Sequence, residues 1–88
     1  MKINFEELSE KLGSLTGNDL LMAERDCRTA GENFPTLQFS SAFQARLAAR
    51  ALNVNYHDLL SLPLKDFNRV CQTVFNFLFN AGSESATT

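Results

Sequence analysis

The stretch LPLKDFNRVCQTVFNFLF, residues 62–79, predicts the last helix of the chain and shows which side of it meets a core. Its apolar side chains recur at the spacing of a helix with one buried face. Pro63 suits the first helical position, where its missing N–H removes no hydrogen bond. The residues of the predicted core face are Phe67, Val70, Cys71, Val74, Phe75 and Leu78.

The end of this predicted helix carries more apolar side chains than one buried face needs. At about 100° per residue, Phe77 lies about 80° to one side of Phe67 and Phe79 about 120° to the other, so the apolar arc widens to roughly 200°. The extra rings have three readings: they close the bundle by packing under Ile3 and Phe5, they mediate self-association, or they contact a partner protein. The candidate partner-binding residues on this helix are Phe75, Phe77, Leu78 and Phe79.

A short helix is predicted near the N-terminus. Asn4 can cap it, and Gly13 is a plausible terminator. Phe5, Leu8 and Leu12 then share one face of the helix. Residues 2–5 can instead form a short extended segment.

A second helix is predicted to begin at Thr16 and Asp19, which have the spacing of a capping box, and to end before Gly31. Its apolar stripe consists of Leu20, Ala23, Cys27 and Ala30. Met22 points away from that stripe. We therefore add Met22 to the candidate partner-binding residues, although its position can also be incidental.

The third predicted helix runs from about Leu37 to Leu52 and is the one expected to lie at the centre. Its apolar face consists of Phe39, Phe43, Leu47 and Ala51. Alanines on the other faces let neighbouring helices approach closely and favour helix formation. Asn53 suits the left-handed position after a helix end, and Asn55 begins a short helical turn.

The predicted fold class is therefore all-α, a small bundle of three main helices plus one or two short helices. The chain has 88 residues, which is the size of one small domain. We expect a single helical domain over residues 1–80. The small and polar residues 81–88 predict a disordered C-terminal tail.

Composition and charge argue against several classes of protein. The chain has 8 basic and 10 acidic residues, and a nucleic-acid binder usually shows a basic patch. No apolar run approaches the roughly 18 residues of a membrane span, and the N-terminus does not resemble a signal peptide. We therefore expect a cytoplasmic protein with neither a nucleic-acid nor a membrane partner. Cys27 and Cys71 are too few for a disulfide framework and are expected to be reduced core residues.

No group of residues in the sequence predicts catalysis. His57 is the only histidine, and it fits a polar position in the first turn of a short helix. Its separation from Cys27 and Cys71 gives no metal-ligand spacing, and no phosphate-binding glycine motif occurs. We expect no catalytic residue, no metal and no cofactor, so a binding protein is a better expectation than an enzyme.

Three segments together carry a resemblance to a known family. They are LTGNDLLMAER (Leu15–Arg25), AARAL (Ala48–Leu52) and HDLLSLPLKDFNRVCQTVFNFLF (His57–Phe79). The patterns L-T-G-x-D-L-x-x-A-E-R and L-P-x-x-D-F-x-x-V-x-x-x-V-x-N-F-L within them resemble the small tail assembly proteins of bacteriophages, in particular the tail assembly chaperones.

This resemblance implies a non-catalytic helper in the host cytoplasm. Such a protein binds the long, helical tape measure protein, or another tail protein, and keeps it soluble until tube subunits assemble around it. A wide apolar arc suits that task, because it can cover the apolar stripe of an unassembled helix. Self-association into a homo-oligomer can use the same surface. The alternatives are a small phage or bacterial DNA-binding regulatory domain, or a structural component of the tail.

Overall fold

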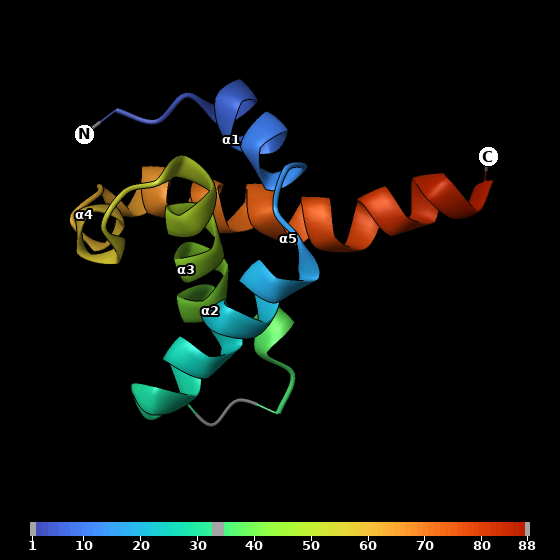
Figure 1. Ribbon diagram of the computed structural model, residues 1–88. Coiled ribbons are helices and arrows are strands. Elements are labelled where there is room, and N and C mark those ends of the chain that lie inside the picture. The colour runs from blue at the N-terminus through green and yellow to red at the C-terminus, as the bar shows by residue number, and fades with distance from the viewer. Residues whose placement is uncertain (1, 33–34, 88) are drawn as a thin grey trace.

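The computed structural model describes residues 2–32 and 35–87, with their side chains up to Phe79. Within these residues it is all-α, without a strand, and this confirms the predicted fold class (Figure 1). The single domain over residues 1–80 and the disordered tail over residues 81–88 stay predictions. The elements are α1 (Phe5–Leu12), α2 (Gly17–Thr29), the 3-10 turn η1 (Leu37–Phe39), α3 (Ser41–Leu52), α4 (Tyr56–Leu60) and α5 (Leu64–Thr87).

Helix α3 lies at the centre, as the sequence predicts, and α5 crosses it (Figure 1). Every other helix and η1 also contact α3. The close approach is explained by small side chains, because alanine lets two helix backbones come together without a void. The buried alanines of α3 are Ala45, Ala48, Ala49 and Ala51.

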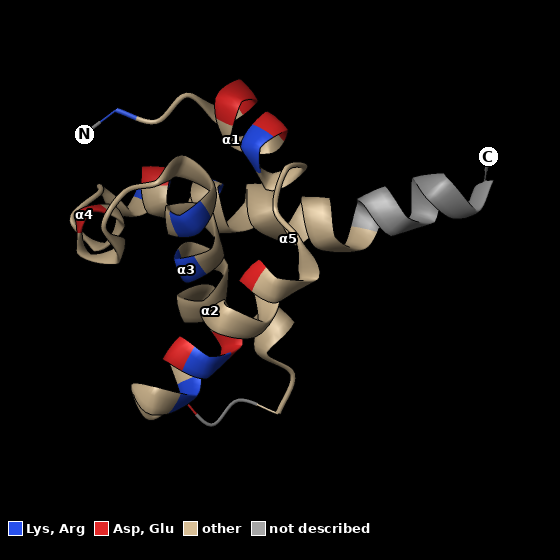
Figure 2. Cartoon of the chain, in the orientation of Figure 1, with Lys and Arg blue, Asp and Glu red and all other residues tan. Residues whose placement is uncertain are grey.

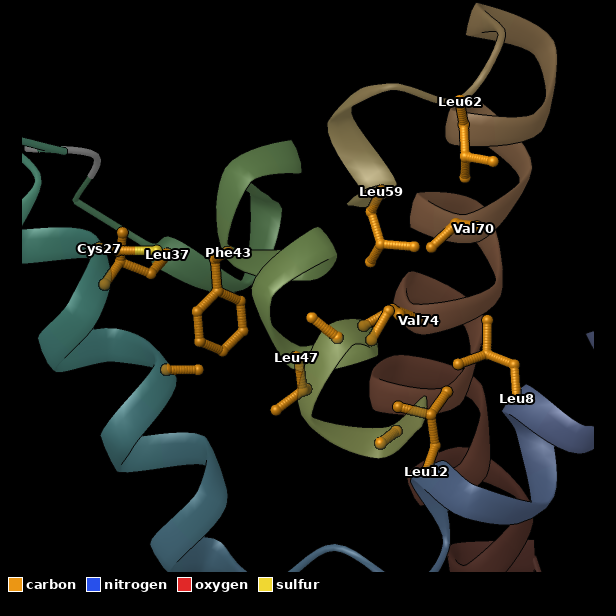
Figure 3. Packing of buried hydrophobic residues seen from close by; sticks show 14 residues of the cluster. Leu8, Leu12, Cys27, Leu37, Phe43, Leu47, Leu59, Leu62, Val70 and Val74 are labelled. Atoms are coloured by element: carbon orange, nitrogen blue, oxygen red, sulfur yellow. The ribbon is translucent and has the colours of Figure 1, made fainter. Parts of the chain in front are cut away.

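The core forms where the apolar faces of these helices meet on α3. Figure 3 shows Leu8 and Leu12 of α1 and Val70 and Val74 of α5 among its members. All four side chains are at most 1% exposed, so the predicted faces of α1 and α5 are confirmed at these positions. On the α2 side the ring of Phe43 is completely buried. Cys27 also lies in the core cluster, and burial raises the pKa of its thiol.

Most helix ends form where the polar residues of the sequence predict them. The side-chain oxygen of Asn4 accepts a hydrogen bond from the backbone N–H of Glu7 at 3.1 Å, and that of Asn55 accepts one from His57 at 2.9 Å. Asn53 ends α3 with a φ of 57°, in the left-handed region that asparagine tolerates. These caps confirm the predicted starts of α1 and α4 and the predicted end of α3.

The predicted start of the third helix is wrong by four residues. The helix begins at Ser41 and not at Leu37, because Ser40 has extended backbone angles and its Oγ accepts a hydrogen bond from the N–H of Phe43. Residues Leu37–Phe39 form the separate turn η1. Phe39 therefore lies in η1 and not on the predicted apolar face of the third helix. Its side chain is 53% exposed.

The predicted core face of α5 is wrong at one position. Phe75 is only half-buried and is not part of the core cluster. It follows Val74 along the chain and is therefore rotated by about 100° from that fully buried residue. This rotation directs the Phe75 ring to the edge of the buried face, where it meets Phe39 of η1.

The start of α2 is tied to the end of α3 by one carboxylate. Asp19 accepts a hydrogen bond from the backbone N–H of Thr16 at 2.9 Å, which supports the predicted capping box. The other oxygen of Asp19 lies 2.9 Å from Nη2 of Arg50. The Thr16 N–H, and after it the Arg50 guanidinium, hold the pKa of Asp19 below its ordinary value of 3.8.

We therefore expect Asp19→Asn to lower the free energy of unfolding at neutral pH. A depressed folded-state pKa contributes stability that is fully present above the unfolded value of 3.8 and is lost as the pH falls through the folded value. The deficit of the variant should thus shrink in strong acid, where the wild-type carboxyl is also neutral. Urea unfolding of both proteins at neutral and acidic pH measures it. A deficit that is equal at both pH values would contradict this account.

Candidate protein-binding surface

Three aromatic rings meet on the outside of the bundle, where η1 lies beside α5. The ring of Phe39 is stacked on that of Phe79, with 5.1 Å between the centroids and 9° between the planes. Phe75 lies 5.9 Å from Phe39 and 4.7 Å from Phe79, tilted against both. We call Phe39, Phe75 and Phe79 the aromatic cluster. Its rings pack on one another and not in the core.

The aromatic cluster is held in place by short-range structure. The Ser40 cap fixes the direction in which η1 enters α3. The side chain of Gln44, which is 5% exposed, donates a hydrogen bond of 2.8 Å to the carbonyl of Gln38 and so ties η1 to the first turns of α3. Because Phe39 is anchored on both sides, its ring is positioned before any partner arrives, which lowers the entropy cost of binding.

A groove of about 280 Å³ adjoins the aromatic cluster. We call it the amide groove, because amide side chains from α3 and α5 line it. Among the residues described, its lining includes no charged side chain. The lining residues are Phe39, Ser41, Gln44, Asn68, Cys71, Gln72 and Phe75.

Cys71 is one of the residues that line the amide groove. Its Sγ is 3.7 Å from the carbonyl oxygen of Ser41, to which it donates, and burial raises its pKa. Both cysteines are buried and neither forms a disulfide, which agrees with their prediction as reduced core residues. A raised pKa keeps the thiol protonated at neutral pH, so this group adds no charge to the groove and is a poor nucleophile.

Phe77 and Leu78 lie on the other side of α5. Both are half-buried and pack against the core cluster. Together with Leu12, Leu15 and Leu20 they line an apolar hollow of about 230 Å³. The segment 75–79 of α5 is thus apolar on two sides. The residues that line this hollow with Phe77 include neither Ile3 nor Phe5, under which the surplus rings were predicted to pack, and Phe79 stacks on Phe39.

The structure separates the candidate residues predicted from the sequence into groups. Phe75 and Phe79 belong to the aromatic cluster, while Phe77 and Leu78 belong to the apolar hollow. Met22 is half-buried on α2 and lines neither the amide groove nor the apolar hollow. Its role in partner binding stays a prediction.

Sequence reasoning missed Phe39, because the four-residue spacing to Phe43 favours one continuous helix. The signal that could have found it is the pair of serines that follows. Ser40 is a preferred capping residue, and a helix that starts after it excludes Phe39 from the helical face.

A polar cleft of about 370 Å³ lies between α2, α3 and α4, and its lining includes Asp19, Asp26, Arg46 and Arg50. The Arg46 guanidinium lies 4.0 Å from the centre of the Tyr56 ring, and burial raises the pKa of the Tyr56 hydroxyl. Two carboxylates balance the two guanidinium groups, so the cleft is not a cationic site. Figure 2 likewise shows acidic and basic residues interspersed on α2.

No group of three or more His, Cys, Asp or Glu side chains in the described part of the chain could hold a metal ion. None of the described helices combines the length and apolar character needed to cross a bilayer. His57 is exposed, with its ring 5.8 Å from that of Tyr56.

Comparison with known proteins adds no relative: the chain matches no protein-family model, no curated protein and no solved structure.

Proposed function

We propose that this chain is a non-catalytic chaperone of bacteriophage tail assembly, which binds the tape measure protein in the host cytoplasm and keeps it soluble before the tail tube forms. The observation that carries the proposal is the aromatic cluster. Its three rings gather on the outside of the bundle, and Phe39 is 53% exposed. The resemblance of the Leu15–Arg25 and His57–Phe79 segments to tail assembly chaperones supplies the identity of the client.

The size and the fixed position of the aromatic cluster suit a protein client. An aromatic side chain can bury about 150–250 Å² when a partner covers it, and aromatic rings are among the residues that dominate binding energy. A long helical protein that has not yet assembled exposes an apolar stripe along each helix. A preformed aromatic surface can cover such a stripe and so remove it from competing self-association.

Co-expression tests the proposal. The tape measure protein encoded nearest to this gene is produced with and without the chain, and its soluble fraction is measured. We expect the soluble fraction to rise severalfold when the chain is present, and the two proteins to co-purify. Equal solubility in both cultures would contradict the proposal. Detection of the chain in purified phage particles would favour a structural tail component instead, because a chaperone leaves before the particle is complete.

A further inference from the structure

The polar cleft between α2, α3 and α4 is lined by two acidic and two basic side chains, of which only one of each is paired. Asp19 and Asp26 lie two turns apart on one face of α2, and Arg46 and Arg50 lie one turn apart on α3. Arg50 is paired with Asp19 at 2.9 Å. Neither Asp26 nor Arg46 forms an ion pair with any residue that the structure describes. We call Asp26 and Arg46 the open pair.

Arg46 packs on an aromatic ring instead of on a carboxylate. Its guanidinium lies 4.0 Å from the centre of the Tyr56 ring, which belongs to α4. Its Nε is buried and has no hydrogen-bond partner among the described residues. The buried thiol of Cys27 lies close by: burial raises the pKa of this thiol, and the Arg46 guanidinium partly opposes that effect. A ring face and a thiol hold the guanidinium in position, but neither supplies a strong acceptor for its N–H groups.

The other polar groups of the cleft also have unused hydrogen-bonding capacity. Asp26 is exposed, and its carboxylate accepts no hydrogen bond from a described residue. The side-chain amide of Asn53 and the hydroxyl of Tyr56 line the same cleft, likewise without a hydrogen-bond partner in the part of the chain that the structure describes. Ala49 and Val54 add apolar surface between them. The cleft therefore combines a cation, an anion and two neutral polar groups.

The balance of charges restricts which ligand the open pair can take. A simple anion on Arg46 would share the cleft with two carboxylates, and a simple cation on Asp26 would share it with two guanidinium groups. A small zwitterion meets an opposite charge at each end and carries no net charge of its own. The cleft volume of about 370 Å³ lies at the lower end of the usual range for small-molecule sites, which suits a ligand of amino-acid size.

We infer that the open pair binds a small zwitterion, with the ligand carboxylate on Arg46 and the ligand ammonium group on Asp26. The Tyr56 hydroxyl and the Asn53 amide supply further hydrogen bonds. The inference goes beyond the proposed function, because the cleft lies between α2, α3 and α4 and includes no residue of the aromatic cluster.

Titration of the full, isotope-labelled chain with small probes tests the inference by NMR. The zwitterionic probes are glycine, β-alanine and γ-aminobutyric acid, in which the two charges lie at increasing separations. Propionate and propylammonium carry one charge each and are compared at equal ionic strength. We expect at least one zwitterion to cause saturable shifts of the backbone amide signals around Arg46 and Asn53, with a roughly millimolar Kd. The probes with a single charge should bind about tenfold more weakly or worse.

Substitution of Asp26 separates a ligand contact from a structural role. Asp26 is exposed, so Asp26→Asn is expected to fold. In this variant the zwitterion should lose its advantage over propionate, because the ammonium group has lost its counter-charge while Arg46 still holds the carboxylate. Arg46→Gln should abolish the binding of both. Arg28→Gln is the matched control and should bind as the wild type does, since Arg28 is exposed on α2 and does not line the cleft.

Two results would overturn the inference. One is the absence of saturable shifts for every zwitterion in the wild-type chain. The other is propionate binding to the wild-type chain as tightly as the zwitterions, which would make the cleft a plain anion site. Neither result bears on the proposed function, which is tested by co-expression and depends on the aromatic cluster.

Discussion

Replacing Phe39 and Phe75 together with serine is expected to abolish the solubilising effect on the tape measure protein while the chain remains folded. Aromatic residues at the centre of an interface commonly contribute 2 kcal/mol or more each, so the double substitution should weaken binding by roughly a thousandfold. Neither residue belongs to the core cluster, and Phe39 is 53% exposed. The cost in folding comprises the ring contacts within the aromatic cluster, about 0.5–1.5 kcal/mol per pair, and the apolar area that the half-buried Phe75 ring covers.

The measurement combines the co-expression assay with thermal unfolding of the purified variant. Leu60→Ser is the matched control, because Leu60 is an apolar side chain of similar exposure, 47%, that lies on α4 outside the aromatic cluster. We expect the control to solubilise the client as the wild type does. If the double variant is folded and equally effective, the aromatic cluster is not the client-binding surface. If the control is equally impaired, general surface hydrophobicity accounts for the effect.

Phe43→Ala is expected to have the largest effect on stability of any single substitution considered for this chain. The ring is completely buried on the α2 side of α3, within the core cluster (Figure 3). Truncating a buried phenylalanine costs about 3–5 kcal/mol, because the contacts of the ring are lost and a cavity remains. A domain of this size has a total stability near the lower end of the usual 5–15 kcal/mol, so the variant should be unfolded in a substantial fraction of molecules.

Urea unfolding followed by circular dichroism measures this effect. Phe43→Leu is the companion variant, since it keeps most of the apolar volume and should cost about 1–1.5 kcal/mol. A loss below about 1 kcal/mol for Phe43→Ala would show that α2 and α3 close the cavity by moving together. The same pair of variants indicates whether loss of client binding follows loss of folding, because Phe43 belongs to the core cluster and not to the aromatic cluster.

Local sequence signals predicted the ends of α1, α3 and α4 correctly. Asn4 and Asn55 cap α1 and α4 in the structure with the hydrogen bonds expected of them, and Asn53 ends α3 in the left-handed region. These features depend on hydrogen bonds between residues that are two to four positions apart. Such local hydrogen bonds depend little on the tertiary structure, so they can be predicted from the sequence alone.

The candidate site was only partly predictable, because it depends on contacts between distant residues. The spacing of α5 identified Phe75 and Phe79 as part of a surplus of apolar side chains, yet Phe75 was assigned to the core. What decides its environment is Phe39, which lies far away in sequence and meets it only when η1 folds against α5. Periodicity places a residue on its own helix, but it does not show what covers that helix.

The sequence by itself determined the class of fold and the ends of most helices, since these follow from apolar spacing and local hydrogen bonds. Only the tertiary structure decided how the three rings of residues 75–79 divide between two surfaces. Phe77 packs toward the leucines of α1 and α2, while Phe75 and Phe79 join Phe39 on the outside. The physical reason is that a helix surface is continuous, and the neighbouring elements that meet each part of it are fixed by the packing of the whole chain.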